Sequence, residues 1–299
     1  MNGRRELGSL SPRAVEDVVR RALAEDAPWG DLTSETLIPA GAQLSAKLVA
    51  REAGVLSGIT VFSAAMRLTD EATEVTPLLS DGLRFEKGDV LADVSGSARS
   101  VLTAERVALN FVQRMSGIAT MTSQFVAAVA GTRARIVDTR KTTPGLRLFE
   151  RYAVRCGGGQ NHRFSLSDAV LAKDNHLAVL TRNGERNLTE ALREVRRALP
   201  HTAHLEVEVD RPNQIAAVLD AGVDTIMLDN FSLDAMRAAV EQIGGRALVE
   251  ASGSVKLEAV RAIAETGVDI ISVGALTHSA RALDLGLDAQ TGAATGADR

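Results

Sequence analysis

The sequence predicts an α/β protein whose C-terminal half contains a parallel sheet, because apolar runs and amphipathic helical stretches alternate there. Four of the apolar runs begin at residues 205, 225, 247 and 270, and the helical stretches between them end at glycines. Repeated strand–helix units with short glycine turns are typical of either a barrel or a doubly wound sheet. Earlier in the chain the pattern differs, with short alternating runs that indicate a small antiparallel sheet.

The N-terminal elements begin with a helix. Ser11 is its expected N-cap, Pro12 occupies its first position, and Pro28 ends it. Residues 43–62 and 73–94 carry the short alternating runs, which are broken by glycines, so antiparallel strands are expected there.

Within the second of these regions, residues 85–91 resemble part of a biotinyl or lipoyl carrier domain. Such a carrier needs a modifiable lysine in a hairpin, whereas Lys87 lies in a turn that precedes a strand. A surface turn is therefore the expected interpretation of this segment.

A buried helix is expected from about Ala104. Arg106, Asn110 and Gln113 form one polar stripe on it at positions i, i+4 and i+7, and its other faces are mostly apolar. The stripe either faces a binding site or another subunit, or it is a solvated face. The pattern alone leaves both interpretations open.

From residue 134 onward, strands and helices are expected to alternate. One helix has Asn187 as its N-cap, Glu190 three residues later and Pro200 after its end. The tail from Asp288 is rich in alanine, glycine and polar residues and is expected to be loose. The other elements are strands at 136–137, 169–172, 205–209, 225–228, 247–249 and 270–273, and helices at 212–220, 232–243 and 256–266.

Composition indicates a soluble globular protein of one large or two modest domains. The chain has 299 residues, 45% of them hydrophobic and 24% charged, with a formal net charge of −4. That charge argues against general binding to nucleic acid or to membranes. The lone cysteine, Cys156, excludes an internal disulfide and a cysteine-based zinc site. Because no signal core and no membrane-spanning apolar segment is found, a cytoplasmic location is expected.

Positive side chains gather in three clusters, at residues 139–141, 157–163 and 173–176. The chain has only five lysines and five histidines, and two of each lie in these clusters. Each cluster lies at the end of an apolar run or beside a glycine turn, where α/β proteins carry functional residues. The clusters therefore predict a pocket for a multiply charged anion. The glycine run 157–159 is either a flexible turn or a backbone that approaches a ligand closely.

The residues just after each predicted strand should converge at one mouth of the sheet. They form a basic half and an acidic half, the latter containing Glu208, Asp210 and Asp229. Such carboxylates suit Mg²⁺ bound to a polyphosphate, although a strand-end aspartate more often caps the next helix. Gly253 and Gly274 follow the last two strands, where barrels commonly bind a phosphate through backbone N–H groups.

Seven motifs occur in one collinear order along nearly the whole chain. They are Glu105-Arg106 through Asn110 to Thr120, Asp138 to Gly145, Gly157-Gly158-Gly159 with Asn161-His162-Arg163, Lys173-Asp174-Asn175-His176, Glu206 to Val209, Leu228-Asp229-Asn230 and Glu250 to Gly253. Together they make the chain resemble the quinolinate phosphoribosyltransferase family. One departure is Ser254, where that family usually has a second glycine in the phosphate loop.

The resemblance implies a small N-terminal α/β sandwich domain of residues 1–116, completed by about 276–299, and a C-terminal open or incomplete α/β barrel of residues 117–275. It implies Mg²⁺ as the cofactor. It also implies a homodimer, or a higher oligomer built from dimers, in which Arg106 of one subunit completes the site of the other. The implied reaction joins quinolinate to phosphoribosyl pyrophosphate and gives nicotinate mononucleotide, pyrophosphate and carbon dioxide, in de novo NAD biosynthesis.

The chemistry of quinolinate fits the basic residues. Its two adjacent carboxylates require planar bidentate donors, which Arg140, Arg163 and Arg106 of the partner subunit could supply. His162 and Lys173 would add further donors.

The phosphoribosyl donor fits the remaining candidates. Lys141 and Mg²⁺ would neutralise the leaving pyrophosphate, while Glu208 and Asp229 would bind the metal and the ribose hydroxyls and stabilise positive charge on the ribosyl centre. The other expected contacts to substrate are Thr139, Ser252, Gly253 and Gly274.

Two alternatives remain at this stage. The first is a phosphoribosyltransferase for nicotinate or another aromatic acid, although the candidate cations exceed what one carboxylate needs. The second is a non-catalytic anion sensor on the same scaffold. The presence of Glu208 and Asp229 together with Lys141 argues against a sensor, which gains nothing from carboxylates beside a phosphate.

Overall fold

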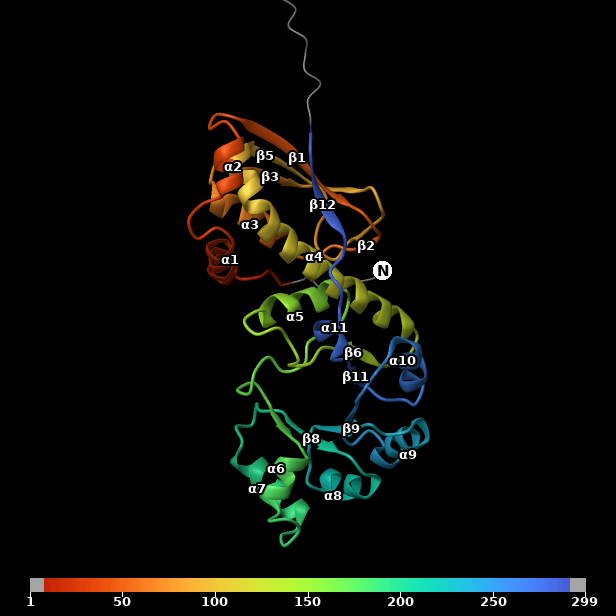
Figure 1. Cartoon of the computed structure of the whole chain (residues 1–299). Helices are drawn as coiled ribbons and strands as arrows, with labels where there is room; N and C mark the ends of the chain where they lie inside the picture. Colours follow the sequence, from red (N-terminus) through yellow and green to blue (C-terminus); the bar gives the residue numbers. More distant parts are fainter. Residues whose placement is uncertain (1–7, 291–299) are drawn as a thin grey trace, which may run out of the picture. The chain divides into compact units, whose positions relative to one another are not determined.

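The computed structural model describes residues 8–290, which form two compact units (Figure 1). Unit 1 comprises the described residues up to Met121, together with Leu148–Gly158 and the residues from Ala280 onward. Unit 2 comprises Thr122–Arg147 and Gly159–Ser279. The division differs from the predicted boundaries mainly at Leu148–Gly158, a segment that groups with unit 1.

Unit 1 is built on a four-stranded antiparallel sheet with the order β12-β1-β5-β3. The predicted small N-terminal sheet domain is therefore confirmed. Two further short strands, β2 and β4, pair with each other. The strands of unit 1 are β1 Gln43–Ala50, β2 Gly54–Val55, β3 Glu74–Pro77, β4 Arg84–Phe85, β5 Val90–Ser97 and β12 Leu285–Ala289.

The last strand corrects one prediction. The tail from Asp288 was expected to be loose, but Asp288 and Ala289 belong to β12 and pair with Lys47 and Ala46 of β1. Leu283, Leu285 and Leu287 alternate with polar residues or glycine, a period-two pattern that the prediction overlooked, and the strand pairs with a neighbour that lies far away in the sequence. The rest of the predicted loose tail, from residue 291, lies outside the described residues.

Three helices of unit 1 were not predicted from the sequence: α2 Leu32–Leu37, α3 Ile59–Thr69 and α5 Arg147–Cys156. Residues 59–62 were expected to be part of a β region, but they begin helix α3. Its buried residues Phe62, Ala65 and Met66 follow a helical spacing, which the strand interpretation overlooked. The other helices are α1 Pro12–Asp26, which starts after Ser11 as predicted, and α4 Ala98–Ala128, which begins before the expected Ala104 and continues into unit 2.

Unit 2 contains a parallel sheet of six strands with the order β6-β11-β10-β9-β8-β7. From β7 to β11 each new strand is added on the same side of the previous one, and β6 lies next to β11. A doubly wound sheet would reverse direction at a switch point. The order therefore identifies an open barrel, with a gap between β6 and β7, and decides between the two predicted architectures. The strands are β6 Arg135–Val137, β7 Val170–Ala172, β8 Leu205–Val209, β9 Thr225–Asp229, β10 Leu248–Ser252 and β11 Ile270–Ser272.

Helices alternate with these strands, as predicted. The N-cap of α7 is Asn187, whose side chain accepts a hydrogen bond from the backbone N–H of Glu190 at 3.1 Å. The helices are α6 Asp174–Leu180, α7 Leu188–Ala198, α8 Ile215–Asp220 after a short 3₁₀ turn at Pro212–Gln214, α9 Leu233–Ile243, α10 Leu257–Ala264 and α11 Ala275–His278.

A loop lies along one edge of the gap in the barrel. Gln160 forms a parallel bridge with Val137 of β6, and its backbone N–H donates to the carbonyl of Ile136 at 2.8 Å. Three residues later, the Arg163 guanidinium donates to the carbonyl of Ala169, just before β7, at 2.9 Å. The loop that carries two of the predicted site residues is thus held by both edges of the open sheet.

The register of the strands separates polar from apolar side chains. Glu208 of β8, Met227 of β9 and Glu250 of β10 lie opposite one another and share the inner face of the sheet. Asp229 and Ser252 form the next layer toward the carboxyl ends of the strands. The intervening residues on the outer face are apolar and buried: Val207, Val209, Ile226, Leu228, Val249, Ala251 and Ile271. The period of two therefore directs the polar residues into the barrel mouth.

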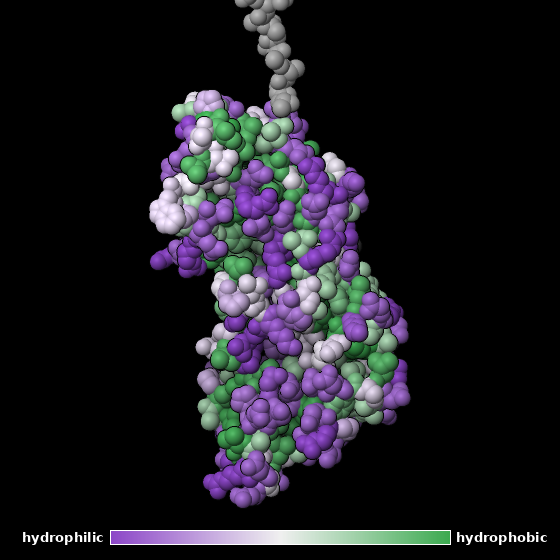
Figure 2. Space-filling model, viewed as in Figure 1, coloured by the Kyte–Doolittle hydropathy of each residue, from purple (hydrophilic) through white to green (hydrophobic). Residues whose placement is uncertain are grey.

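The surface is mixed in character. Figure 2 shows hydrophilic residues spread over the visible face of both units, with smaller apolar areas among them. Among the residues described, none of the helices combines the length and the hydropathy needed to cross a membrane.

Candidate functional site

A cavity of about 760 Å³ opens at the carboxyl ends of the barrel strands in unit 2. All the predicted site residues except Arg106 line it. Cations contributed by the loops after β6 and β7 stand on one side, and carboxylates at the ends of β8 and β9 on the other. The predicted residues in its wall are Thr139, Arg140, Lys141, His162, Arg163, Lys173, Glu208, Asp229, Ser252, Gly253 and Gly274.

Arg106 lies on α4 in unit 1. Its neighbour in the predicted polar stripe, Asn110, is exposed as Arg106 is. The third member, Gln113, is partly buried and donates a hydrogen bond to the carbonyl of Leu285 at 2.7 Å. The stripe is therefore divided, with an exposed part that offers Arg106 to a ligand or a partner and a third residue that supports the fold.

The loop after β6 supplies one cationic wall. The buried carboxylate of Asp138 accepts hydrogen bonds from the Asn161 side chain at 2.6 Å and from the backbone N–H of His162 at 2.8 Å, so it ties this loop to the next. The Thr139 hydroxyl accepts the backbone N–H of Lys141 at 3.1 Å. The Nε of Arg140 is buried and has no hydrogen-bond partner among the described residues. A buried N–H of this kind is costly unless a ligand satisfies it.

Arg163 brings a second guanidinium close to Arg140. Burial and the positive charge of Arg140 lower the pKa of Arg163. Two guanidinium groups that repel each other in a partly dry pocket are stabilised when an anion binds between them. The glycine run before this loop contains Gly158 at a φ of 87°, and it forms a turn at the end of α5.

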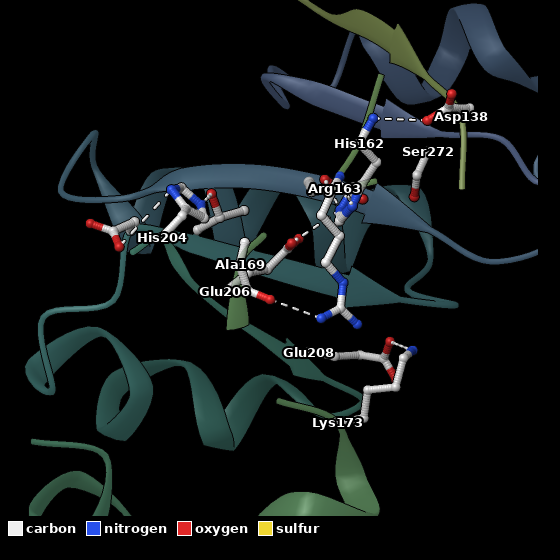
Figure 3. A network of polar contacts seen from close by, with 12 residues as sticks. Asp138, His162, Arg163, Ala169, Lys173, His204, Glu206, Glu208 and Ser272 are labelled. Carbon is white, nitrogen blue, oxygen red and sulfur yellow. Dashed lines mark hydrogen bonds and ion pairs between the residues drawn. The ribbon is translucent and has the colours of Figure 1, made fainter. Parts of the chain in front are cut away.

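His162 faces two buried carboxylates on the inner face of the sheet, one of which, Glu206, is labelled in Figure 3. Its Nε2 lies 3.1 Å from Glu206 and 3.6 Å from Glu250. Burial lowers the pKa of His162, but its hydrogen bonds to these carboxylates outweigh that effect and raise it. Burial and the charge of Glu250 raise the pKa of Glu206.

These three residues are close enough to hold a metal ion, with their ligand atoms within 4.8 Å of one another. However, the backbone N–H of Arg163 donates to Nδ1 of His162 at 2.8 Å, which keeps the proton on Nε2. A protonated Nε2 cannot ligate a metal. The cluster is therefore better described as a hydrogen-bonded triad that fixes the ring at the floor of the cavity.

The acidic wall consists of Glu208 and Asp229, at the ends of neighbouring strands. Lys173, the residue before α6, forms an ion pair with Glu208, and Figure 3 shows the two side chains directed toward each other. The Asp229 carboxylate accepts a hydrogen bond from the side chain of Asn230 at 2.9 Å. Two carboxylates at one edge of a cavity are the donor set that Mg²⁺ uses together with phosphate oxygens.

Glycines in the loops after β10 and β11 leave the backbone uncovered, so a ligand can approach it closely. Gly253 has a φ of 128°, and a Cβ there would lie 2.4 Å from the Asn230 side chain, so only glycine fits. Gly274 precedes α11, and a Cβ there would come within 3.0 Å of the Lys141 side chain. Ser254 lines the cavity and is exposed, so the departure from the family pattern adds a hydroxyl to the wall.

The cavity is also lined by two basic residues, Lys256 and His278, that were not predicted from the sequence. Lys256 follows the Ser252-Gly253 loop and is one of only five lysines, which was a usable signal. His278 lies one turn after Gly274, with its Nδ1 2.6 Å from the Ser279 hydroxyl. Asp210 and His176 do not line the cavity; His176 instead accepts the backbone N–H of Lys173 at 3.1 Å.

A smaller cavity of about 310 Å³ lies toward the amino ends of the same strands. Its lining includes Arg135 and His204, and it shares His162, Arg163 and Glu250 with the larger cavity. The polar triad therefore separates two hollows within the barrel.

Comparison with known proteins gives consistent matches over nearly the whole chain. Residues 31–116 match the family model described as the N-terminal domain of quinolinate phosphoribosyl transferase, and residues 118–288 match that of its C-terminal domain. The nicotinate-nucleotide pyrophosphorylase [carboxylating] of Mycobacterium leprae is 46% identical over 284 residues, which cover 92% of this chain and 97% of that protein. A probable nicotinate-nucleotide pyrophosphorylase [carboxylating] of Bacillus subtilis is 41% identical, with coverages of 92% and 93%. The crystal structure of NadC from Streptococcus pyogenes superposes with a TM-score of 0.88 at 41% identity, covering 94% of this chain and 99% of that one.

Proposed function

Since the chain belongs to the quinolinate phosphoribosyltransferase family, we propose that the larger cavity of its barrel is the active site and that the residues predicted from sequence perform the reaction there. The enzyme joins quinolinate to phosphoribosyl pyrophosphate and releases nicotinate mononucleotide, pyrophosphate and carbon dioxide, a step of de novo NAD biosynthesis. Membership of this family argues against the two alternatives left by the sequence, a nicotinate-specific enzyme and a non-catalytic sensor. The observation that carries the site assignment is the division of one cavity into a cationic and an acidic wall.

Quinolinate would bind at the cationic wall. Arg140 and Arg163 would supply planar donors for its two carboxylates. The Nε of Arg140, which has no partner among the described residues, would donate to a carboxylate oxygen. Lys173 would add a third charge from the loop after β7. His162, fixed by Glu206 and Glu250 beneath it, would shape the floor on which the ring rests.

The phosphoribosyl donor would bind at the acidic wall and the glycine loops. Backbone N–H groups at Ser252, Gly253 and Gly274 would hold a phosphate. Glu208 and Asp229 would hold Mg²⁺, and both could also bind the ribose hydroxyls. When bound, Mg²⁺ supplies positive charge that stabilises the leaving pyrophosphate.

Lys141 and Thr139 would act beside the leaving group. Lys141 lies along Gly274, which brings its charge to the phosphate side of the cavity, and the Thr139 hydroxyl orders the backbone of Lys141. The bond from the anomeric carbon to pyrophosphate breaks as the bond to the ring nitrogen of quinolinate forms. Positive charge that develops on the ribosyl centre is stabilised by the nearby carboxylates.

Decarboxylation needs no dedicated base in this scheme. After ribosylation the ring nitrogen is cationic and accepts the electron pair that the departing 2-carboxylate leaves on the ring. A proton then takes the place of carbon dioxide at that carbon. The protein contributes orientation and exclusion of water.

The active unit would be a homodimer, or a higher oligomer of dimers, in which Arg106 of the partner subunit completes the quinolinate subsite. Both units expose apolar side chains that a partner could cover, among them Trp29, which is 96% exposed, and Val179, which is 81% exposed. The lone Cys156 is buried and free, which suits a cytoplasmic location.

The test is turnover of quinolinate labelled at its 2-carboxylate, in the presence of phosphoribosyl pyrophosphate and Mg²⁺. Labelled carbon dioxide and nicotinate mononucleotide should appear in equal amounts, and excess chelator should abolish both. Nicotinate replaces quinolinate in the control reaction. Equal turnover of nicotinate would refute the proposal that the cationic wall binds two carboxylates. Activity unaffected by chelator would refute the proposal that Mg²⁺ is the cofactor.

A further inference from the structure

Lys173 and Glu208 neutralise each other at the wall of the cavity, where they follow and end the neighbouring strands β7 and β8. Lys173 comes from the loop that follows β7, and Glu208 from the carboxyl end of β8. Their Nζ and Oε2 atoms form an ion pair, which Figure 3 shows. The Glu208 side chain is only 13% exposed, whereas that of Lys173 is 45% exposed. Glu208 is therefore the more buried member of the pair, and Lys173 is the more solvent-exposed one.

The proposed function requires the two groups to serve different ligands. Lys173 should contact the quinolinate dianion, and Glu208 should contact Mg²⁺. An ammonium group bound to Glu208 occupies the carboxylate oxygen and repels a divalent cation. In turn, the carboxylate cancels much of the attraction that Lys173 exerts on an anion. The intact pair thus weakens both subsites.

We propose that Glu208 is a positioning residue that holds Lys173 until a divalent cation binds to Glu208 and releases the lysine toward the dicarboxylate. The inference rests on the proposed function and adds a coupling between its two subsites. Because such coupling is reciprocal, the dicarboxylate should also increase the affinity for the cation by the same factor.

A simpler electrostatic explanation must be separated from this one. Any positive charge added to the acidic wall, or any carboxylate removed from it, would attract a dianion more strongly. Asp229 provides the matched control, because it belongs to the same wall but its carboxylate accepts a hydrogen bond from Asn230. Glu208→Gln and Asp229→Asn each remove one negative charge, and only the first releases Lys173.

The experiment is calorimetric titration of the full chain with phthalate. Phthalate keeps two adjacent carboxylates on a planar ring, but it has no ring nitrogen and so chelates free Mg²⁺ less than quinolinate does. The proteins are wild type, Glu208→Gln, Asp229→Asn, Lys173→Met and the double variant Lys173→Met/Glu208→Gln. The titrated stoichiometry reports the folded, competent fraction of each variant. Wild type is titrated with and without Mg²⁺.

Without metal, Glu208→Gln should bind phthalate about fivefold more tightly than wild type, which is the size expected for freeing one partly exposed ion-pair partner. Asp229→Asn should gain less than about twofold. In the Lys173→Met background, Glu208→Gln should gain no more than Asp229→Asn does. In wild type, Mg²⁺ should reproduce the gain of about fivefold, and in Glu208→Gln it should add nothing.

Equal gains in Glu208→Gln and Asp229→Asn would overturn the proposal in favour of general electrostatics. An unchanged affinity of wild type in Mg²⁺ would overturn the release by the cation. Failure of the function itself is separately visible, since it would appear as absent quinolinate turnover in wild type. Turnover with no coupling therefore refutes only this inference.

Discussion

Replacing Arg140 with lysine tests the quinolinate subsite most cleanly. The Arg140 Nε is buried without a partner among the described residues, and burial together with the positive charge of Arg140 lowers the pKa of the neighbouring Arg163. Lysine keeps the charge but loses the planar fork and the Nε donor. Arg163 is a less clean target, because its guanidinium also binds the carbonyl of Ala169 at the gap in the barrel. Arg163→Lys should impair the enzyme at least as much.

The expected loss follows from the geometry of one charge-assisted contact. Breaking such a contact in a desolvated site costs about 2–4 kcal/mol. That corresponds to a decrease of roughly 30- to 1,000-fold in kcat/KM for quinolinate. The KM for phosphoribosyl pyrophosphate should change little, because Arg140 lies in the opposite wall.

The assay is initial-rate kinetics against quinolinate at saturating phosphoribosyl pyrophosphate. Arg133→Lys is the matched control, because the Arg133 side chain is 59% exposed and pairs with Asp269 outside the cavity. The control should stay within about twofold of wild type. A decrease of less than about threefold for Arg140→Lys would mean that Arg140 does not hold a carboxylate of quinolinate.

Two further predictions concern the dimer and stability. Mixing inactive Arg106→Ala and Lys141→Ala subunits should restore about a quarter of wild-type sites, since about half of randomly mixed dimers contain one intact site; no recovery despite demonstrated subunit exchange would mean that Arg106 does not act across the dimer. In unit 1, the Arg281 guanidinium and the backbone N–H of Asp284 lower the pKa of Glu52 from 4.5 to about 2, so the pair stabilises the fold above the ordinary pKa and this contribution is lost as the pH falls toward 2. Glu52→Gln should therefore lower the thermal midpoint at pH 7 and lower it less at pH 3, and equal decreases at both values would contradict the assigned cause.

The repeating part of the fold could be predicted from sequence because its signals are local. Each strand of the barrel is a short apolar run, and each following helix begins or ends with a recognisable cap such as Asn187 or Gly244. Barrel and doubly wound sheet could not be separated, because both produce the same local pattern. The strand order distinguishes them, since β7 to β11 are added in one direction and β6 lies beside β11, and this last pairing is a contact between distant segments.

The parts of the fold outside the repeated strand–helix units were predicted less completely. Strand β12 pairs with β1, more than two hundred residues earlier, and the alternation of Leu283, Leu285 and Leu287 was a local signal that the prediction overlooked. Helix α3 was hidden because its apolar residues also fit a short strand. The segment Leu148–Gly158 groups with unit 1, although it lies in sequence between two parts of the barrel.

The sequence predicted site residues correctly where a charged residue lies at or just after the end of a strand. Lys141, Glu208 and Asp229 follow or end apolar runs, so the geometry of parallel strands was enough to bring them together. Glu206 and Glu250 are buried beneath His162 and were quoted only within motifs. The alternation of the strand does place Glu206 on the same face as Glu208, which is a signal that could have found it.

A crystal structure of the enzyme with quinolinate bound would test whether the larger cavity is the active site. We expect the dicarboxylate to lie in the larger cavity, with its carboxylate oxygens within hydrogen-bonding distance of the guanidinium groups of Arg140 and Arg163, and with Arg106 of the partner subunit beside it. Quinolinate bound instead in the smaller cavity near Arg135 and His204, or on the surface, would contradict the assignment of the active site.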